Sequence, residues 1–481
     1  MFKKIKHFKR RIFAFIKNPG RKYCEALAGW HELSMRKDRF SVLDFDFVKP
    51  PPMRFDSYEK AITVFKNLRR IYQLLRSRKD PVYDRISAHI TVLEKQILRD
   101  TRLDDPSLPF FENTADYRIF CMRTMGVGPA YFTGEYIDSE ISRLGNMIKA
   151  YNEANKGNEI PEPQGSESEK TGDDSLEGSL FMVSEECRDE QDARCFLMEA
   201  VKSLTGPISN LLAMPADDLL RHIHIEFVED NDLPWLNWVS GDRDGFYLRC
   251  NTKRAGALNK STLVRIAVHE LAGHAAHMMK VRDRVEQSFE DDHALMTTLV
   301  DPYCYGLEGL ADTLLYALCT LEPVLISKLD PTAKLWAQWR HCKNLIMNNS
   351  RLALLECMCE KNSALGRQNK IDGIVKDAKQ KGLLTDPEYV RDAAQLWVRE
   401  GLKMPYLNIY GQAVHDYMTV MRSLNANELE NFMRGCFSGH TTPRMMEERY
   451  GNLLAQERNR NQIPFAGLSG QKVDTKLLRA L

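Results

Sequence analysis

The stretch VRIAVHELAGHAAHMMK, residues 264–280, contains three histidines and a glutamate whose types and spacing could do chemistry. The imidazoles of His269 and His274 are zinc ligands by type, and the carboxylate of Glu270 can take a proton from water. The spacing is H-E-x-x-x-H, whereas the common zinc-protease motif places its histidines four residues apart. The stretch therefore indicates a metal site with one residue more than an ideal helix accommodates.

The extra residue constrains the backbone between the two histidines. Residues five apart on an ideal α-helix point about 140° away from each other, so they would not face one ion. A π-type bulge absorbs one residue and brings both histidines to one side, and Gly273 lets the backbone relax at little cost. We predict such a bulge, or a break, around residues 271–273. A straight helix would instead align Glu270, His274 and His277, which stays open as a second ligand set.

A catalytic zinc needs three protein ligands and one open position. Glu308, in the helical pattern YGLEGLADTLLYAL at residues 305–318, is the best candidate for the third ligand. Two histidines and a glutamate from a later helix form the ligand set of the gluzincin class. Glu270 would then act as the general base on zinc-bound water. The run EDDH at residues 290–293 is a weaker metal candidate, since such polar runs more often cap a helix or face solvent.

H-E-x-x-x-H followed by E-G-L-A resembles the microtubule-associated tyrosine carboxypeptidase family and its bacterial relatives named for a Q-E-G-L-A motif. The resemblance covers about residues 221–417, including YLNIYG at residues 406–411. Leu307 stands where the family has glutamine. The resemblance implies a gluzincin-like zinc metallopeptidase that releases a C-terminal residue, tyrosine or another bulky one, from a peptide or protein.

A carboxypeptidase also needs a cation for the terminal carboxylate and a donor for the developing oxyanion. Lys253 and Arg254, in NTKRAG ahead of the motif, are the candidate substrate-binding cations. Tyr406 and Tyr410 are the candidate oxyanion donors. Weaker candidates for the same role are His415 and Arg444.

The surrounding pattern predicts a mainly α fold with a small β-sheet. Residues 55–151 carry apolar positions at helical spacing, and HIHIEFV (222–228) and GFYLRC (245–250) read as strands. NKST, at residues 259–262, supplies an N-cap for the motif helix.

The chain is expected to divide into four segments. Nine basic and no acidic residues among the first 24 predict a basic amphipathic helix, which either contacts an anionic membrane surface or packs on the body. A later stretch rich in acids, glycine, proline and serine predicts an exposed, disordered loop. The expected segments are a basic N-terminal segment (1–50), a helical region (51–156), the acidic loop (157–179) and a metallopeptidase domain (180–481).

Composition limits the remaining possibilities. The 481 residues are 43% hydrophobic with a net charge of +1, which gives no general attraction to nucleic acid. Eleven cysteines without a C-x-x-C pair favour a reducing, cytoplasmic location, with peripheral membrane contact as an alternative. Two other functions stay open: an endopeptidase or dipeptidase with the same zinc chemistry, and a non-catalytic helical scaffold that binds a membrane or a partner.

Overall fold

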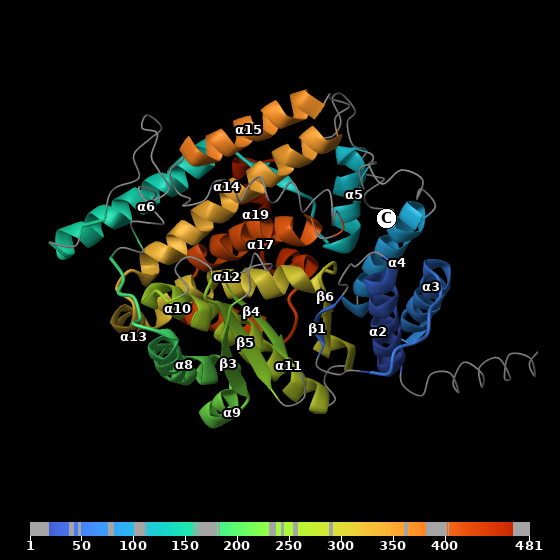
Figure 1. Cartoon of the computed structure of the whole chain (residues 1–481), viewed down its shortest axis with the longest axis horizontal. Helices are drawn as coiled ribbons and strands as arrows, with labels where there is room; N and C mark the ends of the chain where they lie inside the picture. The colour runs from blue at the N-terminus through green and yellow to red at the C-terminus, as the bar shows by residue number, and fades with distance from the viewer. Residues whose placement is uncertain are drawn as a thin grey trace, which may run out of the picture.

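The computed structural model describes a mainly helical protein with small sheets, as the sequence predicts. Figure 1 shows the chain from the N-terminal helices in blue to the C-terminal helices in red. The residues it describes are 19–37, 43–46, 50–75, 81–100, 111, 113–156, 159–160, 180, 183–229, 237–241, 245–253, 258–287, 292–359, 364–380, 402 and 404–464.

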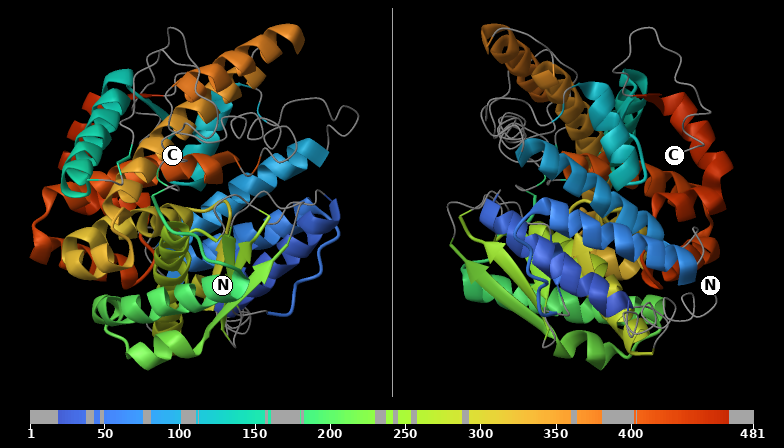
Figure 2. Two further views of the ribbon diagram at one scale, coloured as in Figure 1. Left: turned by 60° about the vertical axis from the view of Figure 1, so that its left-hand side comes forward. Right: turned by 90° about the vertical axis from the view of Figure 1, so that its right-hand side faces the viewer.

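The N-terminal part forms a layer of three helices that lie side by side (Figure 2). They are α2 (Pro19–Lys37), α3 (Tyr58–Leu75) and α4 (Pro81–Asp100). Apolar positions at helical spacing, such as Tyr23, Leu27 and Trp30 of α2, are buried in the shared core. The helical prediction for residues 55–151 is confirmed in α3, α4, α5 (Thr114–Thr124) and α6 (Gly134–Ala154), with a short strand, β2 (Ala130–Phe132), between the last two.

A three-stranded sheet packs beside the motif helix, in the order β3 (Ile223–Val228), β5 (Phe246–Asn251), β4 (Asn237–Gly241). β3 and β5 are parallel, and β4 is antiparallel to β5. Alternation buries Ile225, Val239 and Leu248. Both strands expected from the sequence are therefore confirmed.

The centre of the protein is α12 (Tyr303–Leu321), which lies between α17 (Met404–Ser423) and α14 (Ala333–Cys359) on one side and the motif helix on the other (Figure 1). The motif helix begins as α10 (Lys260–Ile266), whose N-cap Asn259 accepts a hydrogen bond from the backbone of Thr262, as predicted. It ends as α11 (Ala276–Glu286).

Two strand pairs join distant parts of the chain. β1 (Leu43–Asp46) pairs with β6 (Met296–Thr298), and β2 pairs with β7 (Gln462–Pro464), both antiparallel. These pairs cross the expected segment boundaries at 156 and 180, although the division itself stays a prediction. The other elements are α8 (Glu190–Leu212), α9 (Ala216–Arg221), a 3₁₀ helix (Asp292–Leu295), α13 (Pro323–Leu329), α15 (Ala364–Gln380), α18 (Ala426–Phe437) and α19 (Pro443–Asn461).

The predicted basic helix and acidic loop fall largely outside the described residues. Residues 1–18 are not among them, whereas the remainder of the N-terminal segment contributes the buried helix α2. Of the acidic loop only residues 159–160 are described. Among the described residues no single helix is long and apolar enough to cross a membrane; α12 and α13 meet that test only as a pair, bent by 114° at the break between them.

Candidate metal centre

The motif helix is a π-helix over nine residues, Ala267–Ala275. At its end the Ala276 N–H donates to the carbonyl of Leu271, a five-residue step. The predicted distortion around residues 271–273 is therefore confirmed, and it extends over the whole H-E-x-x-x-H motif. The imidazole rings of His269 and His274 consequently lie on one side, with centroids 4.9 Å apart.

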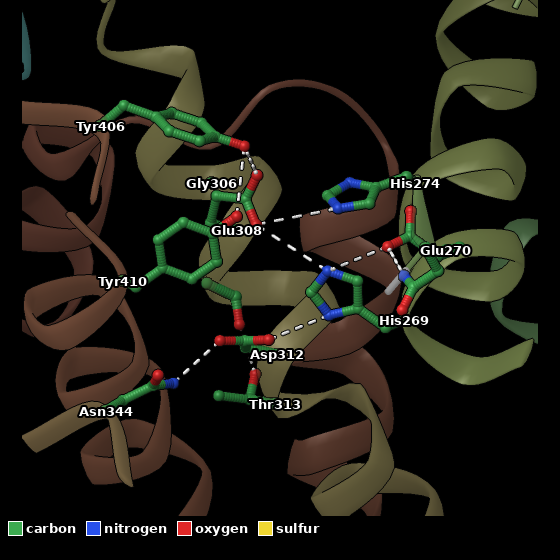
Figure 3. A network of polar contacts seen from close by, with 12 residues as sticks. His269, Glu270, His274, Gly306, Glu308, Asp312, Thr313, Asn344, Tyr406 and Tyr410 are labelled. Atoms are coloured by element: carbon green, nitrogen blue, oxygen red, sulfur yellow. Dashed lines mark hydrogen bonds and ion pairs between the residues drawn. The ribbon is translucent and has the colours of Figure 1, made fainter. Parts of the chain in front are cut away.

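Gly273 sets how closely this π-helix crosses α12. A Cβ atom on Gly273 would lie 2.7 Å from Cα of Ala311, a distance that real Cβ atoms do not tolerate. Glycine is therefore required for the two backbones to touch, rather than only for flexibility. The close crossing brings the side chain of Glu308, one turn before Ala311, opposite the two histidines (Figure 3).

Three ligand atoms converge at this crossing. Oε2 of Glu308 lies 3.8 Å from Nε2 of His274 and 4.0 Å from Nε2 of His269. Two ligands about 2.1 Å from a tetrahedral zinc lie about 3.4 Å apart, so small side-chain movements would close the site around an ion. Glu308 is 2% exposed, and its Oε2 accepts no hydrogen bond from the described residues. Two imidazoles and an unsatisfied buried carboxylate oxygen fit a zinc ion.

Glu270 lies beside the point where His269, His274 and Glu308 converge. With the two histidines it forms a second possible set of metal ligands. One ligand atom each from His269, Glu270 and His274 lie within 4.8 Å of one another. Oε1 of Glu270, however, accepts a hydrogen bond of 2.5 Å from Asn237 of β4. Because Glu308 offers an oxygen near both Nε2 atoms and Glu270 is held by the sheet, the geometry favours Glu308 as the ligand and Glu270 as its neighbour.

Asp312, which the sequence reasoning missed, orients the first histidine. Its Oδ1 lies 2.9 Å from Nδ1 of His269, so that Nε2 faces Glu308. Asp312 is itself held by Arg340 at 3.0 Å and by the amide of Asn344 at 2.8 Å. Its position one helical turn after Glu308 was the available signal, because residues four apart share a helix face.

Burial changes the pKa of the groups at the centre. It raises the pKa of Glu308 to about 7, although the charge of His269 opposes the shift. Burial lowers the pKa of His269, but the hydrogen bond and charge of Asp312 outweigh it and raise the pKa to about 9. Burial also raises the pKa of Glu270 and lowers that of His274 well below its usual range. A cation would therefore displace protons from Glu308 and His269 near neutral pH.

The two predicted tyrosines lie at the centre, both on α17 (Figure 3). The hydroxyl of Tyr406 donates to Oε1 of Glu308 at 2.6 Å, and the hydroxyl of Tyr410 lies 3.2 Å from that of Tyr406. This contact occupies the second oxygen of Glu308 and turns Oε2 toward the histidines. The role of either tyrosine as an oxyanion donor stays a prediction.

The other candidates have contacts elsewhere. Nζ of Lys253 lies 2.7 Å from Glu229, and Arg254 lies outside the described residues. His415 is buried beside Asp416. Arg444 lies 2.8 Å from Asp84.

The alternative ligand set that includes His277 is not assembled among the described residues. Nε2 of His277 lies 3.1 Å from the carbonyl oxygen of Gly439, and burial lowers the pKa of His277 to about 4. His277 is therefore a neutral packing residue in this structure.

Of the EDDH run, Asp292 and His293 start a 3₁₀ helix, while residues 290 and 291 lie outside the described part.

Comparisons with known proteins give little further information. No family model matches the chain. No curated protein matches its sequence. A solved structure described as "the putative lipoprotein from Colwellia psychrerythraea" is similar at a TM-score of 0.43 and 12% identity, over 83% of this chain and 68% of that chain. A likeness this weak supports no inference about fold or function.

Proposed function

We propose that this chain is a zinc-dependent metallopeptidase. The observation that carries the proposal is the convergence of His269, His274 and Glu308 on one point, with Glu270 beside it. The π-helix supports it, because it places on one side two histidines that a regular helix would separate. A structural zinc site would use four protein ligands, whereas three ligands leave a position for water and substrate.

In this proposal His269, His274 and Glu308 hold the zinc. When bound, zinc would supply a water of lowered pKa and would polarise the scissile carbonyl. Asp312 holds the proton of His269 at Nδ1 and thereby keeps Nε2 available as a ligand. The hydroxyl of Tyr406 donates a hydrogen bond to Oε1 of Glu308, which leaves Oε2 available as a metal ligand.

Glu270 is the proposed general base. Its side chain is 9% exposed, and the amide of Asn237 holds Oε1 at 2.5 Å. The carboxylate can take a proton from the attacking water and pass it to the leaving amine. Burial supports this role, since it raises the pKa of Glu270 above its ordinary value and so makes the carboxylate a stronger base.

We propose release of a C-terminal residue, tyrosine or another bulky one, as the specific reaction. This part rests on the resemblance of H-E-x-x-x-H and E-G-L-A to the tyrosine carboxypeptidase family. Lys253 and Arg254 remain the proposed cations for the terminal carboxylate. Internal cleavage of peptides would favour the endopeptidase alternative, and release of free amino acids from dipeptides alone would favour a dipeptidase.

The test has two parts. Metal analysis of the purified full-length chain should find one zinc per chain, removable by a chelator. A peptide library with varied C-termini, followed by mass spectrometry, should show loss of one terminal residue with zinc-loaded protein and none with the Glu270→Gln variant. A protein that binds no zinc and cleaves no library member would instead be a non-catalytic scaffold.

A further inference from the structure

We propose that Arg85 and Asp301, which lie outside the metal centre, are a positioning pair for the metal ligand Glu308. The inference rests on the proposed function, because Glu308 is taken as the third zinc ligand. The pair joins α4 of the N-terminal layer to the connection between the motif helix and α12. It thereby makes the N-terminal layer part of the catalytic unit.

Arg85 holds this connection at three points. Its side chain is completely buried, and Nε donates to Oδ2 of Asp301 at 2.9 Å. Nη1 donates to the carbonyl oxygen of His293 at 2.7 Å, and Nη2 donates to that of Met296. The guanidinium carbon also lies 4.8 Å from the centroid of the Tyr303 ring. The planar fork of an arginine suits this task, since one side chain reaches several fixed acceptors.

Asp301 passes this restraint to the start of α12. Its Oδ1 accepts the backbone N–H of Tyr303, the first residue of α12, at 2.7 Å. Its Oδ2 accepts the hydroxyl of Thr298 at 2.7 Å as well as Nε of Arg85. A carboxylate that accepts the N–H of the first helical residue satisfies one of the backbone donors that a helix start leaves unpaired, and its charge interacts favourably with the helix dipole. The start of α12 is thus fixed in position, and Glu308 follows little more than one turn later.

A second set of contacts, made by His440 from the C-terminal part of the chain, also holds this connection. The ring of His440 stacks on Tyr303 at a centroid distance of 4.2 Å, and its Nε2 lies 2.8 Å from the carbonyl oxygen of Ala294. On the α4 side, His89 also faces Asp301 next to Arg85, with Nε2 3.7 Å from Oδ2. The beginning of α12 is thus held both by α4 and by His440, and the Arg85–Asp301 ion pair is the charged contact among them.

Metal binding is sensitive to this arrangement, because ligand atoms must be placed within about 0.5 Å of their productive positions. A helix behaves as a rigid rod over one turn, so a shift of Tyr303 moves Glu308 with it. The motif histidines lie on a different helix and would not follow. Loss of the pair should therefore weaken zinc binding even where the fold survives.

The experiment measures zinc affinity by competition with a chelator, using the full chain and three variants. Asp301→Asn keeps the shape of the side chain but removes its charge from Arg85. Arg85→Lys keeps a cation but loses the fork that reaches His293 and Met296. Glu140→Gln is the matched control, because Glu140 is 2% exposed and accepts from Arg422 at 2.9 Å, but it lies on α6.

We expect zinc affinity to fall at least tenfold in Asp301→Asn and Arg85→Lys, and to change less than twofold in Glu140→Gln. Hydrogen exchange of the metal-free proteins should show faster exchange at residues 303–310 in the first two variants only. These two readouts separate positioning from general stability, since all three variants alter a buried ion pair but only the first two alter the one at the start of α12.

Wild-type affinity in a folded Asp301→Asn or Arg85→Lys protein would overturn the inference. An equal loss of affinity in Glu140→Gln would also overturn it, because the effect would then be general destabilisation. If Asp301→Asn does not fold, Arg85→Lys decides by the same criterion. A wild-type chain that binds no zinc would refute the proposed function instead, and faster exchange at residues 303–310 would still show whether the pair fixes α12.

Discussion

Asp312 lies 2.9 Å from Nδ1 of His269 and is thereby the residue that decides which ring nitrogen faces Glu308. Arg340 lies 3.0 Å from the same carboxylate oxygen, and with His269 it holds the pKa of Asp312 well below the usual range, against the effect of burial. Asp312 is thus ionised at neutral pH and lies next to the candidate metal centre. The only sequence signal for this role is its position four residues after Glu308.

Replacing Asp312 by asparagine should weaken zinc binding about 10- to 100-fold, because the neutral amide orients His269 less firmly and makes it a poorer ligand. Chelator competition measures the change. The matched control is Arg340→Gln, which removes the ion pair but leaves the carboxylate beside His269; it should lose less affinity. Equal losses in both variants would assign the effect to the ion pair rather than to His269.

Replacing Glu270 by glutamine should leave zinc bound and reduce turnover by at least about 100-fold, because an amide cannot accept the proton. The side-chain oxygen of glutamine can still accept from Asn237, so the local packing is preserved. Metal content and peptide hydrolysis are measured on the same preparation. Loss of the metal would identify Glu270 as a ligand, and activity within tenfold of wild type would remove it from the mechanism.

Zinc affinity should rise with pH between about 6 and 9. The pKa of Glu308 is raised to about 7 by burial, and that of His269 to about 9 because the hydrogen bond to Asp312 outweighs burial. Both groups must lose a proton before they bind a cation, so binding releases protons and strengthens as pH increases. Calorimetry in buffers of different ionisation enthalpy counts the released protons.

The raised pKa of His269 also determines how the stability of the metal-free protein responds to pH. The folded pKa of His269 lies above its unfolded value of about 6.5. Protonated His269 therefore stabilises the fold below pH 6.5, and this contribution is lost as pH rises through about 9. A zinc affinity that is constant from pH 6 to 9 would contradict the raised pKa of His269, on which the predictions for zinc affinity and for metal-free stability both depend.

Replacing Gly273 by alanine should destabilise the protein by about 1–3 kcal/mol, because the added methyl meets the backbone of α12 in a packed core. A Cβ atom there would lie 2.7 Å from Cα of Ala311. Zinc affinity should fall as well, since the crossing that aligns Glu308 must widen. Thermal unfolding and chelator competition measure the two effects.

The control for this substitution is Gly373→Ala in α15. A Cβ atom on Gly373 would meet nothing within 4 Å. Alanine there should stabilise the helix by up to about 1 kcal/mol, owing to its higher helix propensity. A Gly273→Ala protein that is as stable as wild type would show that the crossing can relax.

The local sequence determined those features that depend on neighbouring residues. The five-residue spacing of His269 and His274 required a departure from the α-helix, and the structure has one across the whole motif. Alternation in residues 222–228 identified one strand, the run GFYLRC at residues 245–250 identified a second, and Asn259 identified the start of the motif helix. These are short-range effects of backbone periodicity and capping, which a single sequence expresses directly.

Only the tertiary structure decided which distant residues meet. It placed Asn237 against Glu270 and Tyr406 against Glu308, and it gave Lys253 a partner, Glu229, that no periodicity indicates. Such contacts depend on how helices cross and how closely they approach, as Gly273 does against α12. Packing of elements far apart in the chain sets these distances, and no local pattern encodes it.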